Sequence, residues 1–141
     1  MLQITDLLGG PTVLGHDIET QMDLIVLSRD GIPKKSLLFF AKYLDLSVGE
    51  MAKLLPVNER TIQRYTPQKH FNSAVSESIL HIALLVARGV EVFESKEFFL
   101  SWLLQPCIAL GGRAPQSLLT SRFGIGIILD ELTRIEHGIV S

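Results

Sequence analysis

Residues 46–65 read LSVGEMAKLLPVNERTIQRY, and this stretch decides which fold the chain can adopt. Ser47 and Glu50 have the spacing of a capping box, in which each side chain accepts a hydrogen bond from the other residue's backbone N–H. The spacing predicts a helix over residues 48–55. Pro56 ends it, because the residue before a proline is disfavoured in the helical conformation. Asn58 is a favoured cap for a second helix, which we expect to reach Tyr65.

Two short helices joined in this way are typical of a helix-turn-helix. We expect the inner faces to pack through apolar side chains, with the small Ala52 at the crossing of the helices; these are Met51, Ala52, Leu55, Val57, Ile62 and Tyr65. The polar residues then gather on the second helix and just after it, where Arg and Gln suit base edges and Arg and Lys suit phosphates. The candidate DNA-binding residues are Asn58, Glu59, Arg60, Thr61, Gln63, Arg64 and Lys69.

A second interpretation of this segment stays open. Pro56 stands where such motifs usually have a turn glycine, and Glu59 would repel the phosphate backbone. The two helices could therefore be a hairpin that only supports the fold. The sequence favours the helix-turn-helix geometry more strongly than its use on DNA.

The flanking regions predict an all-α fold, because no segment alternates apolar and polar residues as a half-buried strand does. The glycines of residues 1–15 indicate an irregular lead-in or a short first turn. A helix is expected over residues 17–28, and it should stop at Gly31. Pro33 suits the first turn of a further helix that contains Leu37 and Phe40.

Four further helices are expected in the C-terminal half. The first begins at Ser73 or Ser76 and reaches Phe93, and its apolar residues surround it almost completely, which is typical of a buried central helix. Ser95 caps the second, which ends at residues 105–106. A Gly111-Gly112 turn and a short helix beginning at Pro115 follow. Thr120 or Ser121 caps the last helix, whose apolar stripe is Ile125, Ile128, Leu129, Leu132 and Ile135, with Gly138 as its stop.

Composition indicates a folded protein with apolar surface to spare. Hydrophobic residues make up 47% of the 141 residues and charged residues 20%, and the mean hydropathy is +0.32. We expect part of this apolar surface to be covered by a partner. The charge is uneven, at −4 over residues 1–28, +4 over residues 29–70 and −2 over residues 71–141. The middle segment therefore suits an anion, although a solvated helical face would give the same pattern.

Several classes of function are disfavoured. The four histidines stand apart and the one cysteine has no ligand beside it, so we expect no metal site and no disulfide. The glycine pairs lack the strand and the lysine of a phosphate loop, and no pair of carboxylates has a cleft around it. The sequence therefore predicts neither an enzyme nor a cofactor. The longest apolar stretch, residues 79–90, is shorter than the roughly 20 residues of a spanning helix, and we expect a cytoplasmic protein.

The C-terminal half also has a specific order of residues. Its main members, in order, are Trp102-Leu103, Gln105-Pro106, Leu110-Gly111-Gly112, a proline-led segment over residues 115–119, and Gly138. Between and around them stand Val92-Phe93, Phe98, Gly124, Leu132 and Ile135. In this order the chain resembles the C-terminal toxin-binding domain of the Xre/MbcA/ParS-like antitoxin family, over roughly residues 75–141. Gly31-Ile32-Pro33 and Thr61-Ile62-Gln63-Arg64 resemble the family's Xre-like helix-turn-helix region.

The resemblance implies two domains, over residues 1–70 and 71–141, and an antitoxin of a type II system. Such a protein neutralises a RES-domain, NAD-degrading toxin by direct binding, forms a homodimer and represses its own operon at operator DNA. The candidate toxin-binding residues are Trp102, Gly111, Gly112, Arg113, Pro115, Leu118, Arg122 and Gly138. For Trp102 and the leucines, a place in the core of the domain is the alternative, and for Trp102 we favour it. A stand-alone helix-turn-helix regulator and an adaptor that binds neither toxin nor DNA are the alternative functions.

Overall fold

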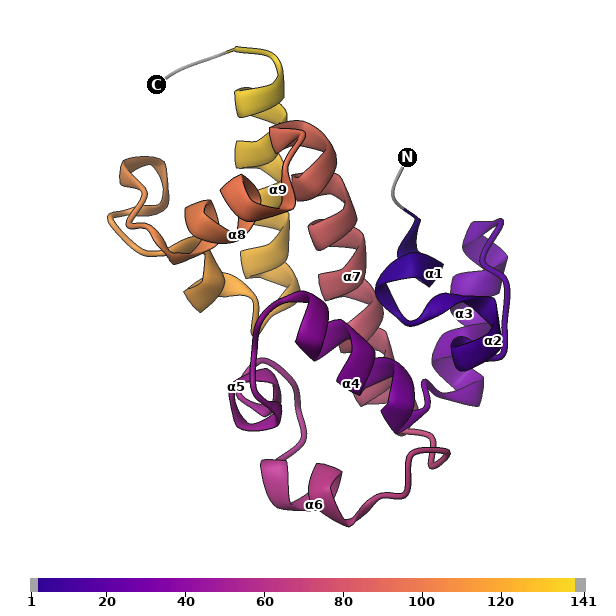
Figure 1. The fold of residues 1–141 in the computed structure, drawn as a ribbon. Helices are drawn as coiled ribbons and strands as arrows, with labels where there is room; N and C mark the ends of the chain where they lie inside the picture. The colour runs from indigo at the N-terminus through magenta and orange to yellow at the C-terminus, as the bar shows by residue number, and fades with distance from the viewer. Residues whose placement is uncertain (1–2, 139–141) are drawn as a thin grey trace. The chain divides into compact units, whose positions relative to one another are not determined.

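The structure is a computed structural model that describes residues 3–138 (Figure 1). Over these residues the chain forms α-helices and two short 3-10 helices and contains no strand, which confirms the predicted all-α fold. The elements are α1 (Ile4–Leu7), α2 (Gly10–Leu14), α3 (Gln21–Asp30), α4 (Lys34–Tyr43), α5 (Val48–Ala52), α6 (Glu59–Arg64), α7 (Ser73–Phe93), α8 (Lys96–Leu104), η1 (Ile108–Leu110), η2 (Pro115–Leu118) and α9 (Arg122–Glu136).

The described chain divides into two compact units inside α7, one over Gln3–Ala83 and one from Leu84 onward. This division lies further along the chain than the expected domain boundary after residue 70. The reason is that residues 71–76 are bonded to the N-terminal unit. The backbone N–H of Phe71 donates to the carbonyl oxygen of Ile32 over 2.9 Å, and the hydroxyl of Ser76 accepts from the N–H of Ile32 over 2.9 Å.

In the N-terminal unit the lead-in is more regular than the sequence indicated. It folds into α1 and α2, which pack against each other and against α4. The helix expected over residues 17–28 begins instead at Gln21, because Thr20 and Asp23 form a capping box that the sequence interpretation missed. The N–H groups of Glu19 and Thr20 donate to the Asp23 carboxylate and lower its pKa.

In the C-terminal unit, aromatic rings hold the end of α7 against α8. Phe99 is fully buried, and its ring lies 5.9 Å from that of Phe93 and 6.1 Å from that of Trp102, between centroids. Gly89 makes this contact possible, because a Cβ there would collide with the Phe99 ring. The predicted stripe of α9 is buried at Ile125, Ile128 and Leu132 and only half-buried at Leu129 and Ile135.

Helix α7 is less uniformly buried than its composition indicated. Ile79, Ile82 and Val86 are fully buried, whereas Leu84 is 37% exposed. The helix has 21 residues and an 18-residue window of mean hydropathy 1.4, so by length and composition it could cross a membrane, contrary to the expectation from residues 79–90 alone. Half of that window is buried inside the protein, as in the core helix of a globular domain.

Candidate functional site: a helix-turn-helix surface and an exposed apolar surface

The helix-turn-helix forms at the predicted residues, with both predicted caps. The Ser47 hydroxyl accepts from the N–H of Glu50 over 3.1 Å, and the Glu50 carboxylate accepts from the N–H of Ser47 over 3.0 Å. These two hydrogen bonds lower the pKa of Glu50. The Asn58 side-chain oxygen accepts from the N–H of Thr61 over 2.8 Å. Helix α5 ends at Ala52 rather than at Leu55, and a turn through residues 53–55 leads to Pro56.

Helices α5 and α6 approach each other at Gly49, and Ala52 of α5 is buried. A Cβ at Gly49 would lie 2.8 Å from Oε1 of Glu59. The other carboxylate oxygen of Glu59 accepts a hydrogen bond from Nε2 of Gln63 over 3.1 Å. Glu59 therefore links α5 to α6, and it occupies Gln63 with an intramolecular partner. The sequence predicted neither contact, because it indicated Glu59 only as a charge that would face DNA.

The outer face of α6 is cationic. Arg60 and Arg64 are exposed and lie one helical turn apart, so they share this face with Gln63. Thr61 differs from them, because it is half-buried and lines a pocket beside α6. Lys69 is exposed beyond the helix, where its ammonium group lies 5.6 Å from the centroid of the Tyr65 ring.

A lysine of α4 donates a hydrogen bond to the C-terminal end of α6. Nζ of Lys34 donates to the carbonyl oxygen of Tyr65 over 2.9 Å, so a cation stabilises the negative end of the helix dipole. The backbone N–H of Lys34 donates to the carbonyl oxygen of Lys69, and that of Lys35 to the carbonyl oxygen of Pro67. The loop after α6 is thereby fixed to the start of α4. The sequence carries no local signal for these contacts.

In the C-terminal unit, the candidate toxin-binding residues divide by exposure. Gly111, Gly112, Arg113, Arg122 and Gly138 are exposed, Trp102 and Leu118 are half-buried, and Pro115 is buried. The Trp102 ring lies 5.5 Å from that of Phe93, between centroids, as expected of a side chain in the core of the domain. The structure does not bring these eight residues onto one exposed surface.

Large apolar side chains that the sequence interpretation did not select are exposed instead in this unit. We call them the exposed apolar set; they are Phe98 (69% exposed), Leu104 (62%), Ile108 (97%), Phe123 (87%) and Ile127 (48%). Exposed apolar side chains of this size are candidates for burial by a partner. The sequence alone did not identify this set, because Phe98 and Leu104 stand next to the buried Phe99 and Leu103. Neighbouring residues of a helix face different sides, and only the structure shows which of the two is exposed.

Ile108 lies in a loop over residues 107–113 that is stabilised by backbone hydrogen bonds within the loop. The N–H of Cys107 donates to the carbonyl oxygen of Arg113 over 3.0 Å, and the N–H of Gly112 donates to that of Cys107 over 2.9 Å. Gly111 and Gly112 have φ values of 72° and 79°, a conformation that glycine adopts without strain. A fixed loop presents its side chain to a partner at a small cost in conformational entropy.

Among residues 3–138, no three potential metal ligands come together. The two units instead match two protein-family models. That of the antitoxin Xre-like helix-turn-helix domain matches residues 23–84, and that of the antitoxin Xre/MbcA/ParS C-terminal toxin-binding domain matches residues 88–138.

Two curated relatives are both named Antitoxin Xre. The protein of Yersinia enterocolitica serotype O:8 / biotype 1B is 31% identical over 95 residues, which are 66% of this chain and 64% of the relative. That of Photorhabdus laumondii subsp. laumondii is 27% identical over the same shares. The match therefore spans less than two thirds of the relatives' own length. With both family models matched in order along its length, the chain belongs to the Xre/MbcA/ParS antitoxin family.

Proposed function

We propose that this chain is the antitoxin of a type II system, which neutralises a RES-domain, NAD-degrading toxin by direct binding and represses its own operon. The observation that carries the proposal is the exposed apolar set, which lies within the residues that match the toxin-binding domain. Ile108 and Phe123 are almost fully exposed. Burying one such side chain at an interface contributes about 1.5–3 kcal/mol.

Neutralisation of this kind needs no catalysis by the antitoxin. The exposed apolar set supplies side chains that a partner surface can bury, and Arg113 and Arg122 lie exposed on the same unit as polar contacts for the rim of an interface. Apolar anchors with arginines around them are typical of tight protein interfaces. We propose a non-enzymatic, cytoplasmic protein that acts as a homodimer.

Repression would use the outer face of α6. The exposed Arg60 and Arg64 suit phosphates and guanine edges in the major groove. Lys69 is a further exposed cation just after the helix. The hydrogen bond from Gln63 to Glu59 restrains the Gln63 side chain, whereas no such bond is recorded for the two arginines among the described residues. We therefore assign DNA affinity to the two arginines.

Co-expression tests the proposal. The chain is produced together with a RES-domain toxin sought in the neighbouring reading frame, and growth and cellular NAD are measured. We expect growth and NAD to recover, and the two purified proteins to elute as one complex. Persistent NAD loss with both proteins present would contradict the antitoxin function. Sequence-specific DNA binding without toxin binding would favour the stand-alone regulator.

A further inference from the structure

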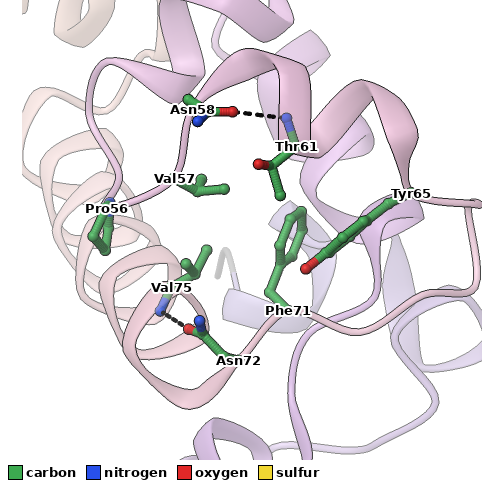
Figure 2. Close-up of a pocket in the computed structure, with 8 residues that line it drawn as sticks. All are labelled: Pro56, Val57, Asn58, Thr61, Tyr65, Phe71, Asn72 and Val75. Carbon is green, nitrogen blue, oxygen red and sulfur yellow. Dashed lines mark hydrogen bonds between the residues drawn. The ribbon is translucent and has the colours of Figure 1, made fainter.

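A pocket of about 500 Å³ lies in the N-terminal unit, beside α6 (Figure 2). It is an open depression lined by the turn before α6, by α6 itself and by the residues at the start of α7. Phe71 and Val75, which are 3% and 2% exposed, form its buried apolar part, and Val57 is half-buried beside them. This volume is within the range of sites that bind small molecules.

Two exposed asparagines line opposite sides of this pocket, and the side-chain oxygen of each already accepts one backbone hydrogen bond (Figure 2). The side-chain oxygen of Asn58 accepts from the N–H of Thr61, and that of Asn72 accepts from the N–H of Val75 over 2.9 Å. Because a backbone N–H needs an acceptor, these bonds fix the orientation of both amides. The NH₂ group of each side chain therefore remains as a double donor.

One end of the pocket is aromatic. The rings of Tyr65 and Phe71 lie 5.3 Å apart, between centroids, at an interplanar angle of 33°. Figure 2 shows the hydroxyl groups of Tyr65 and Thr61 on the same pocket. Among the described residues that line it, none carries a charge. A cation lies close by, because the ammonium group of Lys69 is over the Tyr65 ring.

We propose that this pocket binds a small, flat, apolar molecule that carries a carboxylate. Its ring packs against the half-buried ring of Tyr65, which covers the buried Phe71. Its oxygens accept hydrogen bonds from the NH₂ groups of Asn58 and Asn72, and the positive charge of Lys69 favours the anion. The proposal does not depend on toxin binding, because no member of the exposed apolar set lines the pocket.

The test uses 2-naphthoate as the probe and the ¹⁵N-labelled full chain. We expect saturable shifts of the Asn58 and Asn72 side-chain NH₂ resonances in heteronuclear NMR spectra, with a dissociation constant of about 1 mM or tighter. 2-(Aminomethyl)naphthalene has the same rings but an ammonium group in place of the carboxylate. It should bind about tenfold more weakly.

Asn72→Asp makes the test specific. Aspartate caps a helix as well as asparagine does, so the fold is kept while the NH₂ donors are replaced by a negative charge. We expect naphthoate to bind at least about tenfold more weakly. Asn72→Ser, a neutral cap without the amide, should also weaken binding. Gln68→Glu adds the same charge at an exposed residue outside the pocket and should leave binding unchanged.

Three results would overturn the proposal. The first is the absence of saturable shifts in the wild-type chain, and the second is equal binding of the ammonium compound. The third is naphthoate binding that Asn72→Asp and Asn72→Ser leave unchanged while circular dichroism shows both variants folded. If Asn72→Asp does not fold, Asn72→Ser alone decides the third point.

Discussion

Arg88 near the end of α7 and Glu136 at the end of α9 form a two-fold hydrogen-bonded ion pair. Nη1 of Arg88 donates to Oε2 of Glu136 over 2.9 Å, and Nη2 donates to Oε1 over 2.5 Å. The pair joins residues that are 48 positions apart in the sequence. Hydrogen bonds from Arg88 lower the pKa of Glu136, and the same bonds raise the pKa of Arg88. The ends of two helices of the C-terminal unit are thereby held together.

The Glu136→Gln variant should lower the melting temperature at neutral pH by at most a few degrees, because ion pairs near the surface contribute little. The pKa of Glu136 is lower in the folded chain than in the unfolded chain, where it is about 4.3. The pair therefore stabilises the fold above that pH and loses its effect as pH falls through the folded-state pKa. Thermal unfolding followed by circular dichroism should show the wild type and the variant converge in acid.

Asp130→Asn is the matched control for this variant, since it removes the same charge from an exposed residue of the same helix. It should shift the melting temperature less than Glu136→Gln at neutral pH. A difference between wild type and Glu136→Gln that stays constant from neutral to acidic pH would show that the ionised carboxylate does not stabilise the fold.

The same substitution, glycine to alanine, should have opposite effects on stability at two positions of α9. A Cβ at Gly124 would collide with the backbone carbonyl of Leu118, whereas a Cβ at Gly126 would meet nothing within 4 Å. Gly124→Ala should therefore destabilise the protein by about 1–3 kcal/mol. Gly126→Ala should stabilise it by roughly 0.5–1 kcal/mol, because alanine is the better helix former. Urea unfolding of both variants checks this, and a destabilising effect at Gly126 equal to that at Gly124 would contradict it.

Features that depend on a few neighbouring residues could be predicted from the sequence. Ser47, Asn58, Ser95 and Ser121 cap helices as expected, because each cap bond joins residues three apart in the sequence. The capping box of Thr20 carried the same signal and was overlooked. Helix type was less predictable, since the segment that begins at Pro115 is a 3-10 helix.

Features that depend on distant residues could not be predicted. The bonds from Lys34 to Tyr65 and from Ile32 to Ser76 join residues 31 and 44 positions apart. Helix α6 has six residues, less than two turns, so the side on which Thr61 lies is known only once its packing partners are known. Ile108 and Pro115 lie in 3-10 helices that are also short, so the sequence did not show that Ile108 is exposed and Pro115 buried.

The double variant Arg60→Ala plus Arg64→Ala should weaken operator binding and leave toxin binding intact. If each arginine contacts one phosphate, the slope of log affinity against log salt should fall by about 1.8. Arg29→Ala plus Lys42→Ala removes the same charge from exposed positions on other helices and should have a smaller effect. Fluorescence anisotropy with operator DNA at several salt concentrations measures this. Equal loss of toxin binding would show that the arginine pair supports the fold.

Ile108→Asp and Phe123→Asp should each weaken toxin binding about 30-fold or more, because both replace an apolar anchor with a charge that the interface would have to bury. The folded structure should tolerate both changes, since the two side chains are 97% and 87% exposed. Isothermal titration with the purified toxin gives the affinities.

Met22→Asp is the matched control for these variants, as a 63% exposed apolar residue in the N-terminal unit. It should leave toxin binding unchanged. Trp102→Ala should act differently, since this ring packs on Phe93 and Phe99 and its removal should lower stability by about 3 kcal/mol or more. If Ile108→Asp and Phe123→Asp bind toxin as tightly as wild type, these two members of the exposed apolar set do not contact the toxin.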